Sequence, residues 1–388
     1  MLSRYIVLSR KYRPKDLKDL IGQDVLVRSL KSCLDNNKVP HAFLFHGIRG
    51  VGKTTTARIL ARCLNCVGHD EPEQTTSSPC GTCRSCVAMD SDNHLDVMEF
   101  DAASRTGVED IREIIEASQY SPVVGKFKIF IIDEVHMLSK NAFNALLKIL
   151  EEPPLHVKFI FATTELHKIP ETILSRCITF QLNPVRLSAV ADHLVTISQK
   201  EGFALSKSAA DVISEESEGS VRDALSILDQ AMMLSQETKD IEEDSVISML
   251  GSVRSSDISN LLGLILAAKT KESLDKTDSL LQNGCDPCML FKRLQTALYR
   301  EIVENVRNTD KLAISNLLHI WQVLLGQTEN MKQAARPGYV LVAAIAILAH
   351  TASFPQIEEL MIKKPPSKGN LVNDILSKFP GSKATEIE

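Results

Sequence analysis

The chain has 388 residues, of which 44% are hydrophobic and 24% charged, and its formal net charge is −5. These values are ordinary for soluble globular proteins, and the length is sufficient for two or three domains. They exclude a fibrous, a wholly disordered and a disulfide-rich secreted protein. The net charge by itself gives no sign of a nucleic-acid partner.

The charge is unevenly distributed along the chain. Residues 1–60 contain 12 basic and 4 acidic residues, whereas residues 201–257 contain 13 acidic and 4 basic residues. Both regions could simply be solvated helix faces. The alternative is that a basic head and an acidic middle region meet different partners.

Neither a signal peptide nor a membrane span is predicted. The longest apolar run, residues 339–349, covers 11 residues and is too short for a bilayer, so it predicts a buried helix. The nine cysteines are odd in number and no export signal precedes them, which favours metal ligands or core thiols over disulfides. We therefore expect a cytoplasmic protein without membrane contact.

The predicted elements alternate between strands and helices in the first half of the chain. Apolar, β-branched runs predict strands at 42–46, 127–132 and 157–162, and apolar spacing predicts helices at 54–64 and 141–150. This order indicates a parallel sheet with crossover helices. Strand-like runs end near residue 183, and helices are expected at 188–200, 222–235 and throughout 256–361. Residues 363–388 are expected to form a disordered tail.

A glycine-rich loop follows the first predicted strand and opens a helix. It matches the phosphate-loop pattern G-x-x-x-x-G-K-[ST] completely, and consecutive backbone N–H groups at a helix N-terminus favour a bound phosphate. Lys53 is predicted to reach the β- and γ-phosphates, and the Thr54 hydroxyl to hold Mg²⁺. The predicted nucleotide-binding residues here are Gly47, Ile48, Arg49, Gly50, Val51, Gly52, Lys53, Thr54 and Thr55.

Two carboxylates end the strand predicted near residue 132. Asp133 is predicted to hold hydrated Mg²⁺, and Glu134 to act as the general base on the attacking water. The alternative is a pair of capping acids at a strand exit. No guanine-specific Asn-Lys-x-Asp pattern is present, so ATP is favoured over GTP.

Four cysteines have the spacing of a structural zinc site. Cys80, Cys83 and Cys86 form a C-x₂-C-x₂-C run, and Cys66 supplies a fourth thiolate for tetrahedral Zn²⁺. An iron–sulfur cluster is the alternative, and Cys63 is a possible substitute ligand. The pair Cys285 and Cys288 has no second pair nearby and is expected at a turn between helices.

These motifs together resemble the bacterial DNA polymerase III gamma/tau subunits, the AAA+ ATPases of sliding-clamp loaders. The resemblance is dense from residue 4 to about 235 and weak beyond. The matching stretches are Lys11–Pro14, Ile21–Gln23, His41–Phe45, Gly47–Thr54, Leu64–Cys66, the cysteine run, Asp101–Arg105, Asp133–Ser139, Phe143–Lys148, Glu151–Pro154, Phe161–Thr164, Ser175–Cys177 and Gly219–Leu225.

The resemblance implies further site residues. Arg176 resembles an arginine finger that reaches ATP bound to a neighbouring subunit, Thr164 a sensor that orients water, and Arg222 a lid sensor. Arg13, Pro14 and Gln23 resemble the segment around the adenine. Phosphate contacts to primed DNA are implied for Arg105, Lys140 and Lys148, with solvated surface charge as the alternative.

The resemblance also implies a fold, domains and partners. The expected fold is an AAA+ P-loop α/β domain over 1–182 with the zinc module at 66–86, a helical lid over 183–248 and an all-α collar over 249–362. The implied activity is ATP-driven loading of a sliding clamp, with ATP, Mg²⁺ and Zn²⁺ as cofactors. The implied partners are other subunits in a hetero-pentamer, the clamp and primed DNA, with single-stranded-DNA-binding protein and polymerase core as further candidates.

Two other interpretations remain open at this point. Another AAA+ class, a branch-migration helicase or a remodelling chaperone, would require a pore loop or a DNA-reading winged domain and usually lacks the four cysteines. A stator subunit that only binds nucleotide is disfavoured by the intact Lys53, Thr54, Asp133 and Glu134. No polymerase or nuclease metal site is expected.

Overall fold

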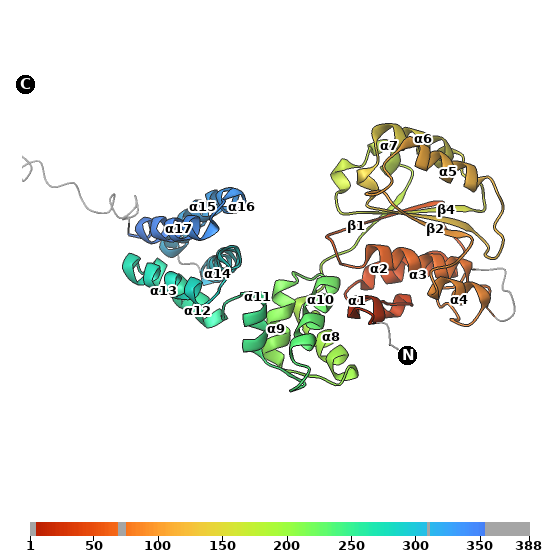
Figure 1. Ribbon diagram of the computed structural model, residues 1–388. Helices are drawn as coiled ribbons and strands as arrows, with labels where there is room; N and C mark the ends of the chain where they lie inside the picture. Colours follow the sequence, from red (N-terminus) through yellow and green to blue (C-terminus); the bar gives the residue numbers. More distant parts are fainter. Residues whose placement is uncertain (1–4, 69–74, 309–310, 354–388) are drawn as a thin grey trace, which may run out of the picture. The chain divides into compact units, whose positions relative to one another are not determined.

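A computed structural model of the chain describes residues 5–68, 75–308 and 311–353. The chain divides into two compact units, one up to Val246 and one from Ile247 onward (Figure 1). The predicted tail at 363–388 lies outside the described residues.

The first unit is built on a five-stranded sheet in which every neighbouring pair is parallel, in the order β2-β3-β4-β1-β5. This confirms the predicted α/β class with a parallel sheet. The strands are β1 Ala42–His46, β2 Val97–Asp101, β3 Lys128–Asp133, β4 Val157–Thr163 and β5 Ile178–Gln181.

Side chains that alternate along the strands divide the core into two layers, one on each face of the sheet. In β1, Phe43 and Phe45 join a cluster with α2 and α3, whereas Leu44 points to the opposite cluster with α5 and α6. Figure 1 shows these two helix layers on opposite sides of the sheet. The helices are α2 Asp24–Asp35, α3 Lys53–Asn65, α4 Arg84–Asp90, α5 Val108–Ser118, α6 Lys140–Glu151 and α7 Glu171–Leu174, with short 3-10 turns at Leu17–Asp19, Val135–Met137 and Leu166–Lys168.

Neither edge strand was predicted from the sequence, and their exposure explains why. Strands β2 and β5 each pair on one side only, and neither contains a fully buried residue. A half-exposed edge strand keeps polar residues such as Glu99 and Thr179 and therefore lacks the continuous apolar run of β3 or β4. The three central strands, which are covered on both faces, are the three that were predicted.

A smaller helical part completes the first unit. It contains α8 Leu187–Lys200, α9 Lys207–Glu216 and α10 Val221–Leu234, and the N-terminal α1 Leu8–Lys11 packs against α10. Two-residue strands β6 Ala204–Leu205 and β7 Asp240–Ile241 pair here, which corrects the expectation that no strand follows residue 183. Helix α11, Glu243–Leu250, runs across the boundary between the units.

The second unit is helical in its described part. Its apolar core includes Leu261, Leu290, Leu324 and Ile345. The apolar run at 339–349 lies within the last described helix, where Leu341, Ile345 and Leu348 are buried, as predicted. Its helices are α12 Ser255–Leu266, α13 Thr270–Gln282, α14 Pro287–Asn308, α15 Lys311–Gly326, α16 Thr328–Gln333 and α17 Pro337–Thr351.

Among the described residues, no helix is both long enough and apolar enough to cross a bilayer.

Candidate nucleotide site and four-cysteine module

The glycine-rich loop connects β1 to α3 and is shaped by close backbone approaches. A Cβ on Gly50 would lie 2.0 Å from Ser220 Oγ, and a Cβ on Gly47 would lie 2.3 Å from the Leu182 carbonyl oxygen. Gly50 also has a left-handed φ of 79°, a conformation that glycine adopts at little cost. The loop therefore needs glycine at these positions, independently of any bound phosphate.

Lys53 begins α3 and is held inside the loop. Its Nζ donates to the carbonyl oxygens of Gly47 at 3.1 Å and Ile48 at 3.0 Å, and only 5% of the residue is exposed. Burial lowers the pKa of the Lys53 ammonium, and the charges of Glu134 and Asp133 oppose this shift. The ammonium is thus positioned at the loop centre, close to the positive end of the α3 dipole.

The two residues predicted to hold Mg²⁺ lie in direct contact. The Thr54 hydroxyl donates to Asp133 Oδ2 at 2.5 Å, which joins the start of α3 to the end of β3. A hydroxyl and a carboxylate are oxygen ligands of the kind that Mg²⁺ takes. The residues present therefore fit a magnesium ion between the loop and β3.

The Glu134 carboxylate is held by hydrogen bonds to Thr164. Its Oε2 accepts hydrogen bonds from the Thr164 backbone N–H at 3.3 Å and from the Thr164 hydroxyl at 3.0 Å. His136 Nδ1 lies 3.5 Å from the same oxygen. Glu134 has a φ of 47°, a left-handed conformation that is uncommon outside glycine and is found where a site constrains the backbone.

These residues line one open cavity of about 1210 Å³. It contains six basic side chains and four acidic ones, so the excess is positive and suits a polyphosphate. Helix α10 contributes Arg222, whose backbone N–H donates to the Gly50 carbonyl oxygen at 3.3 Å. The charged lining residues are Arg10, Arg13, Arg49, Lys53, Arg58, Arg222, Asp92, Asp101, Asp133 and Glu134.

The segment predicted around the adenine lies beside a second, smaller cavity. Arg13, Pro14 and Gln23 line this space of about 80 Å³ together with Gly50, Val51, Gly52 and Thr55 of the loop region. The Gln23 side-chain amide donates to the Asn183 carbonyl oxygen at 2.7 Å and accepts from the Asn183 N–H at 3.2 Å. Gln23 therefore connects the start of α2 to the segment between β5 and α8.

Arg176 lies away from the cavity of its own chain. Its guanidinium donates to Glu151 Oε1 at 2.6 Å and to the Thr172 carbonyl oxygen at 2.7 Å, and it is not among the cavity-lining residues. The structure thus brings Lys53, Thr54, Asp133, Glu134, Thr164 and Arg222 together and leaves Arg176 apart.

Sequence reasoning missed several cavity residues. Arg58 lies on α3 beyond the glycine-rich loop, Arg10 belongs to α1, and Asp92 follows α4. Only Arg58 carried a sequence signal, because its place on the predicted helix put it near the loop. Arg10 and Asp92 reach the cavity through tertiary packing, which no local pattern reveals.

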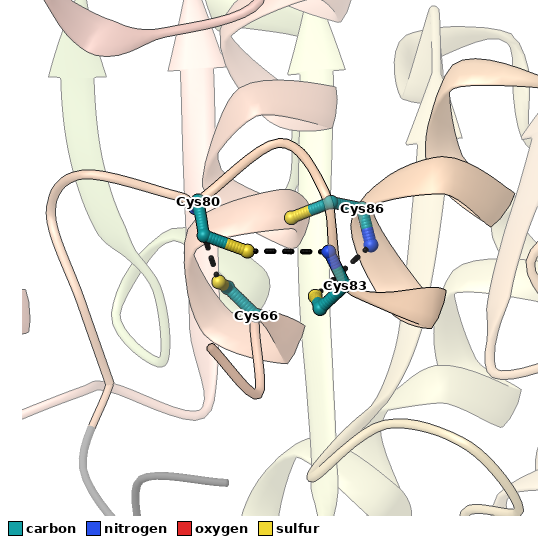
Figure 2. A group of neighbouring side chains, drawn as sticks. All are labelled: Cys66, Cys80, Cys83 and Cys86. Carbon is teal, nitrogen blue, oxygen red and sulfur yellow. Dashed lines mark hydrogen bonds between the residues drawn. The ribbon is translucent and has the colours of Figure 1, made fainter. Parts of the chain in front are cut away.

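The four predicted zinc ligands come together at the far end of α3. Cys66 immediately follows this helix, and Cys86 lies in α4, whose N-cap is Cys83. Their four Sγ atoms all lie within 4.8 Å of one another. Figure 2 shows the four sulfur atoms gathered from the two chain segments. Cys63, the suggested substitute, is buried but is not part of this group.

The backbone around the sulfurs favours thiolates. Sγ of Cys66 accepts from the Cys80 N–H at 3.3 Å, and Sγ of Cys80 accepts from the Cys83 N–H at 3.3 Å. The N–H of Thr82 is the main cause that lowers the pKa of Cys80 to about 6, whereas burial raises that of Cys86 to about 12. Zn–S bonds of about 2.3 Å put tetrahedral sulfurs roughly 3.8 Å apart, so this donor set fits Zn²⁺.

The other cysteines have ordinary surroundings. Cys33 and Cys177 are half-buried. Cys285 is buried between α13 and α14, whereas Cys288 is exposed on α14.

The three predicted DNA contacts are exposed and lie on α6 and on the loop before α5. The Ser139 N–H donates to the Thr106 carbonyl oxygen at 3.3 Å, which places the loop carrying Arg105 beside the first residue of α6, Lys140. Lys148 lies further along the same helix. The Arg105 guanidinium stacks over the Phe100 ring at 5.5 Å. All three charges are exposed to solvent.

Family models match two parts of the chain. Residues 22–186 match the model described as DNA polymerase III, delta subunit, and residues 189–237 match the model for the DNA polymerase III clamp loader subunit, ATPase lid domain.

The curated relatives are named as gamma or tau subunits of DNA polymerase III. The chain is 46% identical over 247 residues to DNA polymerase III subunit tau/gamma of Haemophilus influenzae, covering 64% of this chain and 35% of that protein. It is 45% identical over 262 residues to subunit gamma of Buchnera aphidicola subsp. Baizongia pistaciae, covering 68% and 69%. It is 34% identical over 382 residues to subunit tau of Bacillus subtilis, covering 92% and 67%. The chain therefore spans about a third of one of these relatives and about two thirds of the others.

A solved structure of the Thermotoga maritima RuvB Holliday junction branch migration motor is similar with a TM-score of 0.46 and 19% identity. The match covers 66% of this chain and 79% of that one.

Proposed function

The chain belongs to the family of DNA polymerase III gamma/tau subunits, and we propose that it is an ATP-hydrolysing subunit of a sliding-clamp loader. With partner subunits it would open the clamp and load it on primed DNA, hydrolysing ATP when DNA binds. One observation carries the hydrolytic part: Lys53, Thr54, Asp133, Glu134 and Thr164 converge on a single cavity with an excess of positive charge.

Each of these residues has a role that follows from its contacts. Lys53 would exchange its carbonyl partners for the β- and γ-phosphate oxygens, because a charged phosphate is the stronger acceptor. Thr54 and Asp133 would hold Mg²⁺, which neutralises phosphate charge. Glu134 would take a proton from the attacking water, and the two hydrogen bonds from Thr164 orient its carboxylate for this.

The contact between the lid and the loop supports a conformational role for nucleotide. The Arg222 N–H and the Ser220 hydroxyl both lie at Gly50, so a change in the loop reaches α10 directly. ATP would then favour one arrangement of lid and core over another. We assign residues 1–182 to the ATPase domain, 183–248 to the lid and 249–362 to a collar that joins subunits.

Arg176 supports a site completed between subunits. Arg176 does not line the cavity of its own chain, so its guanidinium does not serve the nucleotide bound there. It would reach the ATP of a neighbouring subunit by exchanging its bond to Glu151 for one to a phosphate oxygen. The proposed assembly is a hetero-pentamer with the clamp and primed DNA as its targets, and with single-stranded-DNA-binding protein and polymerase core as further partners. Arg105, Lys140 and Lys148 would contact DNA phosphates without reading sequence.

The test is steady-state ATP hydrolysis by the chain alone and with partner subunits, clamp and primed DNA added in turn. We expect slow hydrolysis by the isolated chain and strong stimulation once the full set is present. Lys53→Ala provides the control for nucleotide binding. Hydrolysis that ignores all three additions would contradict a clamp-loading role and favour another AAA+ activity.

A further inference from the structure

Helix α4 ends in two carboxylates that its local structure does not explain. Asp90 is its last residue, and Asp92 follows with a left-handed φ of 53°. The Asp92 N–H donates to the Met89 carbonyl oxygen at 3.3 Å and the Asn93 N–H to that of Ala88 at 3.0 Å, which is the Schellman pattern. Glycine or asparagine is usual at this position, and the helix dipole favours cations there. A tertiary role is therefore indicated.

Both carboxylates pair with basic side chains of the N-terminal segment and of α3. Asp92 contacts Arg10 at 3.2 Å and Arg58 at 2.6 Å. Asp90 contacts Lys15 at 3.1 Å and Arg62 at 2.6 Å. Arg10, Arg58 and Asp92 also line the nucleotide cavity, so this ion-pair network forms part of its wall.

The network holds Arg10 and Lys15, the two ends of the segment that carries the predicted nucleotide contact Arg13. Glu201 holds the two residues just before Arg13. Lys11 Nζ lies 2.6 Å from Glu201 Oε1 on the lid, and the Tyr12 hydroxyl donates to the same carboxylate. Arg13, in contrast, has a guanidinium that no hydrogen bond or ion pair joins to another described residue, and burial is the main cause that lowers its pKa. Its neighbours are therefore fixed while Arg13 and Pro14 face the cavities.

We propose that the acidic end of α4 positions residues 10–15 over the nucleotide, so that the four-cysteine module supports nucleotide binding through Asp90 and Asp92. The module can do this because Cys83 caps α4 and Cys86 lies within it, which places the carboxylates relative to α3. This inference rests on the proposed function, because it assumes that the cavity binds ATP.

The direction in which ATP affinity changes distinguishes this proposal from a simple repulsion between the two carboxylates and the phosphates. Asp92 lines the cavity and Asp90 lies beside it. Removing both negative charges should tighten ATP binding if only their long-range charge mattered. If they position Arg13 and Pro14, their removal weakens binding, because the segment must be ordered when the nucleotide arrives. Three of the four ion pairs are at least a quarter exposed on both side chains, and only Arg62 is buried. Exposed ion pairs are individually weak, so we expect roughly threefold to tenfold weaker binding for the double variant.

The experiment measures the Kd of a fluorescent ATP analogue with Mg²⁺ on the full chain, for the unmodified protein and for Asp90→Asn/Asp92→Asn. The expected increase in Kd should shrink at high salt, which screens the same pairs in the unmodified protein. Zinc content, measured in parallel, should stay unchanged. The melting temperature should fall only slightly, because an asparagine at position 90 can still accept a hydrogen bond from the buried Arg62 guanidinium. Glu109→Gln removes a surface ion pair elsewhere, with Arg112, and is the matched control.

Two further variants distinguish positioning from folding. Asp92→Gly suits the left-handed φ and should preserve stability, yet it should weaken binding like Asp92→Asn. Asp90→Glu keeps the charge, so it should bind the analogue as tightly as the unmodified protein does. Binding by the double variant that is unchanged or tighter overturns the proposal. Failure of the unmodified chain to bind the analogue, or equal binding by Lys53→Ala, would instead count against the proposed function.

Discussion

The nucleotide cavity and the four-cysteine module lie at opposite ends of the same helix, α3, yet they are built on different principles. The cavity lies at the N-terminal end of α3, which packs with strands β1 and β3 in an apolar layer containing Phe43, Phe45 and Ile131. The module lies at the C-terminal end, and its buried cluster consists of Cys66, Cys83 and Cys86 with Val67 and Cys80 against it.

This difference indicates that protein packing forms the cavity, whereas the four-cysteine module depends on a bound metal. A wall of large apolar side chains holds the glycine-rich loop in shape without any bound group. A cluster of small thiols buries little apolar area, so metal–sulfur bonds must supply the stabilising energy. We therefore expect the cavity to exist in the free protein and the module to require zinc.

The largest expected effect is loss of the module. Cys83→Ser removes one thiolate and the Sγ that accepts from the Cys86 N–H. Metal content should fall from about one zinc per chain to nearly none, because structural sites need all four ligands. Elemental analysis and hydrogen exchange of residues 75–90 would show this. Cys288→Ser is the matched control, and a folded, metal-free unmodified protein would contradict the prediction.

Substitution of the predicted general base should separate binding from chemistry. Glu134→Gln keeps the hydrogen-bonding shape but cannot accept a proton, so hydrolysis in the assembled complex should fall by about 10²- to 10⁴-fold. Nucleotide affinity should change little. Single-turnover hydrolysis and equilibrium binding measure the two quantities, with Glu165→Gln as the neighbouring control. Full activity of Glu134→Gln would remove this residue from the mechanism.

Asp96 tests how much hydrogen bonds within the protein, without any bound ligand, stabilise the sheet domain. Its carboxylate accepts from the N–H groups of Val123, Val124 and Gly125 at 2.6–2.7 Å. Burial raises the pKa of Asp96, but these three donors outweigh it and the pKa is lowered. Charge-assisted bonds of this kind contribute about 1.5–3 kcal/mol each, so Asp96→Asn should cost about 3 kcal/mol of unfolding free energy at neutral pH.

The pH dependence of that loss follows from the direction of the shift. A depressed carboxyl pKa stabilises the folded state above about pH 4, and this contribution disappears as the pH falls through the folded value. The gap between the unmodified protein and Asp96→Asn should therefore narrow in acid. Denaturant unfolding at several pH values measures it, with the exposed Asp35→Asn as control; a gap independent of pH would contradict the assignment.

The smallest expected effect concerns DNA. Arg105→Ala combined with Lys148→Ala removes two exposed charges, so stimulation of hydrolysis by primed DNA should fall severalfold and its salt dependence should flatten. The rate without DNA should stay the same. Lys207→Ala, an exposed basic residue on α9, is the control. Equal loss of stimulated and unstimulated hydrolysis would rule out a role in DNA contact.

The sequence predicts those elements whose signal lies in one continuous stretch of the chain. The central strands, α3, α6 and the glycine-rich loop each follow from a local pattern of apolar and glycine residues. The edge strand β2, with Glu99 between apolar residues, gave no such run because only one of its edges is paired. Asp92 and Arg10 were missed because their contact joins residues far apart in the chain. The bond from Thr164 to Glu134 likewise depends on the order of the strands and not on spacing.

The most direct test of a site completed between subunits is Arg176→Ala in the reconstituted complex. ATP binding by the isolated chain should be unchanged, since Arg176 lies outside its own cavity. Hydrolysis by the assembled complex with clamp and primed DNA should fall by about 10³-fold or more, as expected for an arginine finger. Loss of ATP binding by the isolated chain, or unchanged hydrolysis in the complex, would contradict the account.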